Sequence, residues 1–348
     1  MSQEIDFTEL TQRVKDALAG AANATGATML PTETAEEIIG IVYERNFMRS
    51  LFPAMPMNRR KMNIPKLSGS VDFHQQTLSM TEAGTAAGES RHATAEITLE
   101  LKTMIANIPI GNYLVAYGVE GLMAVLRDDI ASRLAFNEAS LLLNGDTETT
   151  YASNINGAYH AANNPLGVSA SANDYKLLFD GLRKSATATE VNAAGALSLA
   201  SLRTAIANLG VYADNRDDLA LIVPRAVEVA LLGITELQTV DKYGPSATIL
   251  NGEIGKIYGV RVFGTGALPT NLDANGVVPA AHNGDKGLAV LTHIRSPLIG
   301  NPTVAERRFS IGFHDEPTKD RFVLIPKQDI AFGVRYSEAI VLIRNITV

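Results

Sequence analysis

Apolar side chains recur every three or four residues between positions 118 and 144, which places them on one face of a long helix. The members of this stripe are Val119, Leu122, Leu126, Ile130 and Leu134. Charged residues lie off the stripe at Arg127, Asp128, Arg133 and Glu138. No proline interrupts the run, and Gly145 in the closing Asn144-Gly145-Asp146 suits a left-handed helix end. At ~1.5 Å per residue the predicted helix is roughly 40 Å long, about twice the average in globular domains.

From Arg59 onwards the pattern changes to a period of two, which is typical of strands. Short strands are predicted at 61–65 and 71–75, and 94–110 is the clearest strand in the chain. Within it the apolar residues Ala95, Ile97, Leu99 and Leu101 alternate with Glu96, Thr98, Glu100 and Lys102. The polar, glycine-containing segment 80–90 lies between these strands. The pattern therefore predicts one long antiparallel hairpin.

A two-stranded hairpin is marginal in water by itself, so its apolar face must pack on its own domain or on a neighbouring subunit. We expect the second case, because the hairpin has no core of its own and open strand edges recruit partners. The candidate subunit-interface residues are Arg59, Arg60, Lys61, Glu82, Glu89, Arg91, Ile97, Leu99 and Leu101. The alternative is that the charged members simply solvate an exposed ribbon.

The rest of the chain predicts an α+β protein. Near the amino terminus, helices are predicted at 3–19 and from Thr34, which forms a capping box with Glu37, to about Phe47. Further helices are predicted at 174–184, 197–212 and 225–233. Further strands are predicted at 219–223, 257–263, 287–291, 309–313, 322–325, 330–336 and 338–346. Strand, helix and strand in that order indicate a small mixed sheet with helices on it.

Composition excludes several classes of protein. The 348 residues include no cysteine, so disulfides, thiolate zinc sites and cysteine nucleophiles are impossible. A net charge of −7 argues against sequence-specific nucleic-acid binding but allows a weak, non-specific contact through one local face. The polar amino terminus is unlike a secretory signal, and the apolar runs are too short to cross a bilayer. We therefore expect a soluble protein made in the cytoplasm.

Candidate chemistry is weak throughout the sequence. Gly264-Thr265-Gly266 follows a predicted strand, but Pro269 stands where a dinucleotide loop needs a third glycine. His314-Asp315-Glu316 is a compact trio of ligand-type residues, for which a turn before Pro317 is the better interpretation. We predict no catalytic, cofactor-binding or metal-binding residue, and no enzymatic activity.

The order of these elements resembles the HK97-like fold of the major capsid proteins of tailed bacteriophages. The segments that carry the resemblance are Glu82-Ala83-Gly84 with 94–117, the helix 121–146 with its Gly145-Asp146 exit, 202–224, 243–262 and 305–348. The resemblance covers nearly the whole chain. It implies an amino-terminal arm at 1–52 and an extended loop, the hairpin, at 53–112. It also implies a spine helix with the first part of a peripheral domain at 113–185, an axial domain at 186–300 and the second peripheral part at 301–348.

The resemblance also implies a function and partners. Such proteins assemble as hexamers and pentamers into an icosahedral shell that encloses double-stranded DNA, so we expect a virion protein made in the cytoplasm of a bacterial host. We expect a separate scaffolding protein and a portal protein as partners, with a decoration protein as a further candidate. We also expect weak contact with the packaged DNA, no cofactor and no membrane. No lysine lies between Lys66 and Lys102, so the loop tip has no donor for the covalent cross-link that some relatives form.

Two alternatives remain open at this point. The first is an encapsulin, which is a cellular shell protein of the same fold. The second, and weaker, is a small-molecule-binding α/β protein with its site near 219–263.

Overall fold

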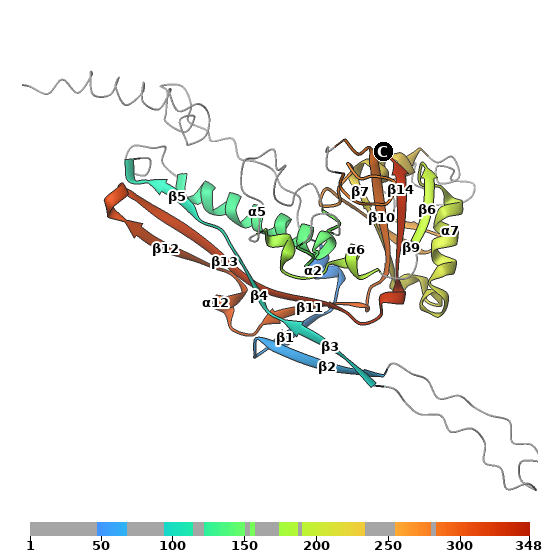
Figure 1. Cartoon of the computed structure of the whole chain (residues 1–348), viewed down its shortest axis with the longest axis horizontal. Helices are drawn as coiled ribbons and strands as arrows, with labels where there is room; N and C mark the ends of the chain where they lie inside the picture. Colours follow the sequence, from blue (N-terminus) through green and yellow to red (C-terminus); the bar gives the residue numbers. More distant parts are fainter. Residues whose placement is uncertain are drawn as a thin grey trace, which may run out of the picture. The chain divides into compact units, whose positions relative to one another are not determined.

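A computed structural model describes residues 47–67, 94–113, 122–149, 154–156, 174–186, 190–233, 255–279 and 283–348 (Figure 1). They form a mixed α+β fold with two compact units. The smaller unit takes its described residues from 105–134 and 309–327, and the larger unit takes them from 44–104, 135–308 and 328–348. The predicted helices before Phe47, the predicted strand at 71–75, the hairpin tip at 80–90 and the start of the long helix lie outside the described residues.

The larger unit contains a six-stranded sheet with the order β6-β14-β10-β7-β9-β8. Its strands are β6 (Glu190–Gly195), β14 (Ile340–Thr347), β10 (Lys286–His293), β7 (Leu219–Pro224), β9 (Val260–Thr265) and β8 (Lys256–Ile257). β14 runs parallel to β6 and β9 parallel to β7, while the other neighbours are antiparallel. The predicted strand at 219–223 is confirmed as β7, which is buried along its whole length as a continuous apolar run requires.

Two helices cover this sheet with their apolar faces. α7 (Leu199–Asn208) begins at Ser198, whose hydroxyl accepts a hydrogen bond from the Ser201 amide at 3.1 Å, and it lies beside β6 and β14 (Figure 1). α8 (Arg225–Leu232) follows β7 directly. The predicted single strand at 257–263 is wrong, because Tyr258 and Gly259 both have positive φ and form the tight turn between β8 and β9.

β13 (Arg321–Val334) is one strand of 14 residues, not the two short strands that the sequence predicted. In the larger unit its carboxyl-terminal half pairs antiparallel with β11 (Pro297–Pro302), which runs parallel to β1 (Ala54–Met57). In the smaller unit its amino-terminal half pairs with both β5 (Ile108–Gly111) and β12 (Ser310–Glu316). The polar stretch Lys327-Gln328-Asp329 misled the prediction because it interrupts the apolar pattern without ending the strand.

The smaller unit has a thin apolar core. Ile110, Ile130 and Leu324 are buried there, and Leu126 and Phe322 pack against them. The strand predicted at 94–110 is three strands, namely β3 (Thr94–Glu100), β4 (Lys102–Ile105) and β5. β4 and β5 both pair with β13.

The long helix is confirmed as α5 (Leu122–Asn144) within the described residues. Ile130 is buried and Asp128 and Arg133 are exposed, as the stripe predicted. Glu138 is a correction, because its side chain is buried. The last turns of α5 are enclosed on all sides, with Leu141, Leu142 and Leu143 fully buried. A single stripe describes a helix with one covered face and therefore fails there.

Gly145 is required for a different reason from the one predicted. It does not have a positive φ, but a Cβ at this position would clash with the carbonyl oxygens of Phe179 and Leu141. The absence of a Cβ lets the backbone at Gly181 approach Gly145 closely, and the Gly181 amide donates a hydrogen bond to the Gly145 carbonyl oxygen at 2.8 Å. The predicted helix at 174–184 is broken at this contact into η3 (Tyr175–Leu177) and α6 (Leu182–Ser185).

A buried polar network fixes the end of α5. The Asp146 carboxylate is fully buried and accepts hydrogen bonds from the amides of Glu148 and Ile155 at 3.0 and 2.8 Å, and it pairs with Lys184 at 3.1 Å. Arg183 donates to the Asn144 Oδ1 atom at 2.7 Å and to a carbonyl oxygen at 2.6 Å. Burial lowers the pKa of Arg183 to about 10. The Gly-Asp exit is therefore an internal anchor.

The remaining described elements are short. They are α2 (Met48–Leu51), β2 (Lys61–Leu67), η4 (Gly210–Ala213), η5 (Arg216–Asp218), α12 (Ala305–Arg308), η7 (Pro317–Lys319) and η8 (Ser337–Ala339). None of the described helices has both the length and the apolar character needed to cross a bilayer.

Candidate subunit interface

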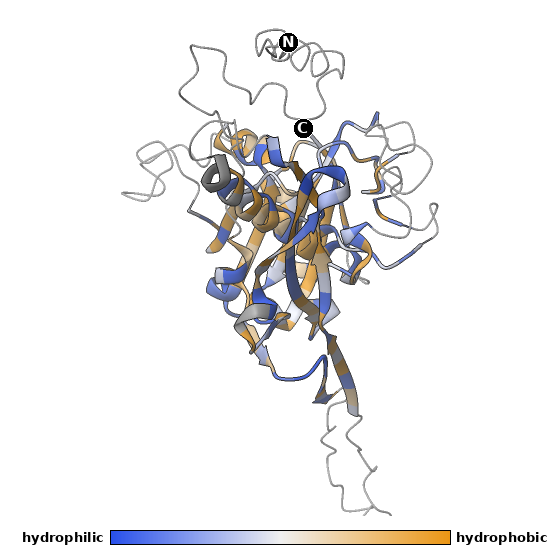
Figure 2. Ribbon diagram, turned by 90° about the vertical axis from the view of Figure 1, so that its left-hand side faces the viewer, coloured by the Kyte–Doolittle hydropathy of each residue, from blue (hydrophilic) through white to orange (hydrophobic). Residues whose placement is uncertain are grey.

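The base of the predicted hairpin is a two-stranded ribbon formed by β2 and β3. The strands pair antiparallel from Lys61 opposite Glu100 to Leu67 opposite Thr94. Hydrophobic and hydrophilic residues alternate along most of the ribbon, as the sequence predicted (Figure 2). The alternation ends at Lys66 and Leu67 on β2. The opposed pair Ile64 and Ile97 lies on the apolar face of the ribbon.

This apolar face packs on its own chain, which corrects the expectation from the sequence that it packs on a neighbouring subunit. Leu99 is fully buried against Met57 and Ala331, and Met62, Ile64 and Leu101 pack around this cluster. The contact depends on Gly333, since a Cβ there would lie 2.7 Å from a Leu99 methyl carbon and 3.3 Å from an Ile97 methyl carbon. The ribbon base is thus anchored on β13, and Leu99 is not available to a partner subunit.

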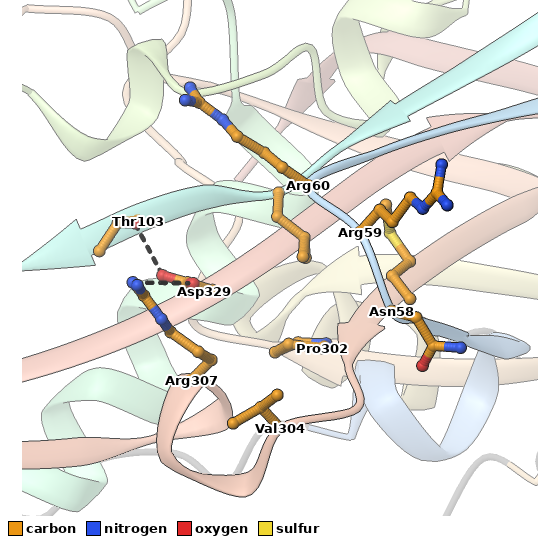
Figure 3. A pocket seen from close by; sticks show the side chains of 10 residues that line it. Asn58, Arg59, Arg60, Thr103, Pro302, Val304, Arg307 and Asp329 are labelled. Carbon is orange, nitrogen blue, oxygen red and sulfur yellow. Dashed lines mark hydrogen bonds and ion pairs between the residues drawn. The ribbon is translucent and has the colours of Figure 1, made fainter.

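A groove of about 460 Å³ lies beside this anchor (Figure 3). Its apolar lining consists of Met57, Leu101, Pro302 and Val304. Its polar lining consists of Asn58, Arg59, Arg60, Thr103, Arg307 and Asp329. Pairing of β1 with β11 places Met57 opposite Pro302. Pairing of β11 with β13 brings the strand that carries Asp329 next to them. Four segments that are distant in sequence therefore meet at this groove.

Positive charge exceeds negative charge in the groove. Asp329 is nearly buried and is already engaged, because it accepts a hydrogen bond from the Thr103 hydroxyl at 2.7 Å and pairs with Arg307 at 3.6 Å (Figure 3). Arg60 pairs with Glu100 at 3.3 Å, and both groups are substantially exposed. Arg59 has no ion-pair partner among the residues that the structure describes. The guanidinium groups of Arg59 and Arg60 point in different directions, so the cations are spread along the groove (Figure 3).

The structure brings only some of the sequence-predicted candidates together. Arg59, Arg60 and Leu101 line the groove, whereas Lys61 is exposed on β2 and Ile97 packs at the ribbon base. Glu82, Glu89 and Arg91 lie outside the described residues. The sequence reasoning missed Thr103, Val304, Arg307 and Asp329. The paired cations Arg307-Arg308 repeat the pattern of Arg59-Arg60 and were the one available signal.

A second set of missed residues anchors the chain just ahead of β1. Arg49 on α2 makes a bidentate pair with buried Glu138 on α5 at 2.6 and 3.0 Å and also donates to Asn301 at 2.8 Å. Gln328 donates to the same carboxylate at 2.5 Å. Phe47 stacks on Phe263 with ring centroids 5.2 Å apart. The chain that precedes Phe47 therefore leaves from a fixed point.

A third contact fixes the far end of β2. The Lys66 ammonium lies 5.7 Å from the ring centroid of Tyr336 and donates to the Arg335 carbonyl at 2.9 Å. Tyr336 in turn packs against Tyr212 with ring centroids 5.6 Å apart. Partial burial, with a smaller effect of Glu338, raises the pKa of the Tyr212 hydroxyl above its usual value. The next residue of the ribbon, Leu67, is 63% exposed.

Comparison with known proteins supplies the family. The model of the phage capsid family matches residues 26–231, which is more than half of the chain. The chain belongs to the phage capsid family. This membership confirms the resemblance inferred from the sequence and identifies a structural protein rather than an enzyme. Among the described residues, no three histidine or acidic side chains are grouped in a way that could hold a metal ion.

One curated relative is the major capsid protein of Klebsiella oxytoca phage phiKO2. It is 26% identical over 136 residues, which are 39% of this chain. The match spans only 30% of the length of that relative.

Solved capsid structures share the fold at low sequence identity. A capsid chain of the native GTA particle has a TM-score of 0.63 at 13% identity, over 94% of this chain and 99% of that one. The mature capsid of bacteriophage PhiM1 has a TM-score of 0.58 at 13% identity, over 91% of this chain and 92% of that one. The capsid of cyanophage P-SCSP1u has a TM-score of 0.58 at 12% identity, over 94% of this chain and 97% of that one. The chain therefore has an α+β fold that matches HK97-like phage capsids.

Proposed function

We propose that this chain is the major capsid protein of a tailed double-stranded DNA bacteriophage. In this role it assembles as hexamers and pentamers into an icosahedral shell around the genome. The observation that carries the proposal is the match of the whole fold to capsid chains, over 94% of this chain and 99% of the GTA capsid chain. Membership of the phage capsid family supports it independently.

The proposed shell draws its stability from many modest contacts. Obligate interfaces bury roughly 2,000 Å² or more, while a single exposed ion pair contributes only ~0–1 kcal/mol. Large apolar side chains are exposed in both units, including Phe313 at 61% in the smaller unit and Val211 at 77% in the larger one. The charges of the ribbon, including Arg59, Arg60 and Lys61, are proposed to lie at the boundary between subunits.

The subdomains are proposed to follow the capsid pattern. The arm is 1–52, the extended loop is 53–112, the spine helix with the first peripheral part is 113–185 and the axial domain is 186–300. Within 301–348, β14 pairs with β10 and β6, so we assign this strand to the axial sheet and the preceding residues to the peripheral domain. The partners are proposed to be further copies of the chain, a scaffolding protein and a portal protein, with weak contact to the packaged DNA and a decoration protein as a further candidate. The protein is proposed to be made in the bacterial cytoplasm and to reside in the virion.

Electron microscopy of the purified, full-length chain tests this function. Closed icosahedral particles with hexameric and pentameric capsomers are expected. A preparation that contains only small soluble oligomers, with the scaffolding protein present as well as absent, would contradict the proposal. Particles from the native source that hold an enzyme instead of DNA would favour the encapsulin alternative.

A further inference from the structure

We propose that Asn283 is a site of spontaneous deamidation in the folded protein, while the same dipeptide at Asn144 stays unreactive until the end of α5 opens. This chemistry is independent of the proposed function and adds a covalent modification that the shell role does not require.

The reaction belongs to Asn-Gly steps. The glycine amide nitrogen, after losing its proton, attacks the asparagine Cγ atom and expels ammonia, and no Cβ shields that nitrogen. Water then opens the resulting five-membered succinimide at either carbonyl and leaves aspartate or isoaspartate. The chain has five such steps, which begin at Asn144, Asn156, Asn251, Asn275 and Asn283. Those at Asn144, Asn275 and Asn283 lie wholly within the described residues.

Asn144 is held against the reaction by three hydrogen bonds. Its side chain is buried, and its Nδ2 atom donates to the Ala267 carbonyl oxygen at 2.8 Å. Its Oδ1 atom accepts from Arg183 at 2.7 Å. The Gly145 amide, which would be the nucleophile, donates to the Leu141 carbonyl oxygen at 2.8 Å. Attack would break all three bonds in a buried site, so it requires the end of α5 to open.

Asn275 is an intermediate case. Its side chain is exposed, but its Oδ1 atom accepts a hydrogen bond from Arg344 at 3.2 Å. The Gly276 amide donates to the Asp273 carbonyl oxygen at 3.0 Å. Two hydrogen bonds near the surface therefore oppose the reaction here, instead of three in the interior.

Asn283 lacks these restraints. It is exposed, and within the described part of the chain neither its side chain nor the Gly284 amide makes a hydrogen bond. The fold itself requires glycine at 284, because a Cβ there would clash with the carbonyl oxygens of Asn271 and Leu272. Packing therefore retains the reactive dipeptide at an unprotected position.

The modified residue would lie next to the start of β10. Lys286 pairs with Asp285 at 3.0 Å and exchanges two backbone hydrogen bonds with Leu272, at 2.9 and 3.1 Å. Either product adds a negative charge beside this pair, and isoaspartate also lengthens the main chain by one carbon atom. Deamidation at Asn283 therefore changes charge and backbone length where the chain enters the six-stranded sheet.

Peptide mapping by mass spectrometry tests the order of reactivity in the full-length protein. Samples are incubated in mildly alkaline buffer with and without concentrated urea and are then digested in acid, so that digestion adds no product. In the folded protein, Asn283 should react at least about tenfold faster than Asn275 and at least about a hundredfold faster than Asn144. In urea the three rates should agree within about threefold, because no fold then protects any of them. A folded-state rate at Asn283 no higher than that at Asn144 would overturn the proposal.

The products identify the mechanism at Asn283. Attack by the Gly284 nitrogen gives isoaspartate together with aspartate, and Asn283→Asp supplies the chromatographic standard for the aspartyl peptide. Asn283→Gln should reduce acid formation at this position at least about tenfold, because its ring would have six members. Asn275→Gln is the matched control and should leave the rate at Asn283 unchanged. Aspartate as the sole product would indicate direct hydrolysis and would overturn the assignment of Gly284 as nucleophile.

Asp146→Ala tests the protection of Asn144. This substitution removes the carboxylate that holds the segment after α5, so opening becomes more frequent and the rate at Asn144 should rise at least about tenfold. The rate at Asn283 should stay within about twofold of the wild type and is an internal control. Wild-type protein in urea below its unfolding midpoint gives the same comparison without a substitution. No rise at Asn144 in either experiment would overturn the proposed protection.

Discussion

The end of α5 and the groove at the ribbon base both gather charged side chains within the larger unit, yet they use them in opposite ways. At the end of α5, Asp146 and Arg183 are buried, and hydrogen bonds to neighbours within the chain hold both side chains. At the groove, Arg59 and Arg60 are exposed, and the one buried carboxylate, Asp329, is outnumbered. Burial makes unpaired charge costly and therefore enforces internal pairing. Exposure removes that constraint, so charge at the groove is free to serve a partner.

The largest expected effect breaks the internal side of this comparison. Asp146→Ala leaves two backbone amides and Lys184 without their acceptor in a fully buried site. We expect the free energy of unfolding to fall by about 3–5 kcal/mol. Urea denaturation of the unassembled subunit measures it. Asp214→Ala removes an exposed carboxylate and is expected to change stability by less than ~0.5 kcal/mol. Similar losses in both variants would show that the network at the end of α5 is not an anchor.

The second effect acts on the exposed side. Reversal of Arg59, Arg60 and Lys61 together to glutamate should lower particle yield at least about tenfold, because attraction at every repeated contact becomes repulsion. The unfolding free energy of the subunit should change by no more than ~1 kcal/mol, since these side chains are exposed. Sedimentation and denaturant unfolding give the two quantities.

A control of equal charge change is Arg203→Glu, Arg216→Glu and Arg225→Glu, three exposed cations outside the groove. A normal yield from the triple reversal at the ribbon would remove these residues from the interface. An equal fall in both triple variants would point to net charge rather than to position.

A smaller effect sharpens the comparison at the point where the ribbon meets the body. Gly333→Ala places a Cβ 2.7 Å from a Leu99 methyl carbon and should lower the unfolding free energy by about 1–2 kcal/mol. Leu99→Ala should lower the unfolding free energy less in the Gly333→Ala variant than in the wild type, because it removes the methyl group with which the new Cβ clashes. A double-mutant cycle from urea unfolding measures the coupling, with Gly312→Ala as the control because no atom lies closer than 3.7 Å to its Cβ position. Strict additivity would show that Leu99 does not pack on β13.

The smallest effect concerns Tyr212, which is intermediate between the buried and exposed cases. Its raised pKa means that the folded state favours the neutral phenol. The resulting stability is fully present below the unfolded pKa near ~10 and is lost as pH rises through the higher folded pKa. Difference titration at 295 nm between the wild type and Tyr212→Phe should show a midpoint above that of free tyrosine. Glu338→Gln should move this midpoint down, and a midpoint at the free value in the wild type would contradict the burial of this ring.

Predictions from periodicity succeeded where the burial of a residue follows from the pattern of its own helix or strand. The run Leu219–Val223 specified a buried strand, and the three- and four-residue spacing specified α5 through Ile130. They failed where residues from other elements determine whether a side chain is buried. Glu138 has the character of an exposed helical residue, but Arg49 and Gln328 come from other elements to pair with it. Arg59 and Arg60 were found by their local charge, whereas strand pairing alone revealed that Arg307 and Asp329 lie beside them.

The sequence by itself determined the long helix, the central apolar strand, the alternating ribbon and the family, because each depends on local spacing or on the order of elements. Only the tertiary structure decided that Leu99 packs on its own chain and that four distant segments form a cationic groove. Both outcomes depend on the register of β1, β11 and β13 and on the missing side chain of Gly333. The energy of such contacts arises between residues far apart in the chain, so local spacing carries no record of it.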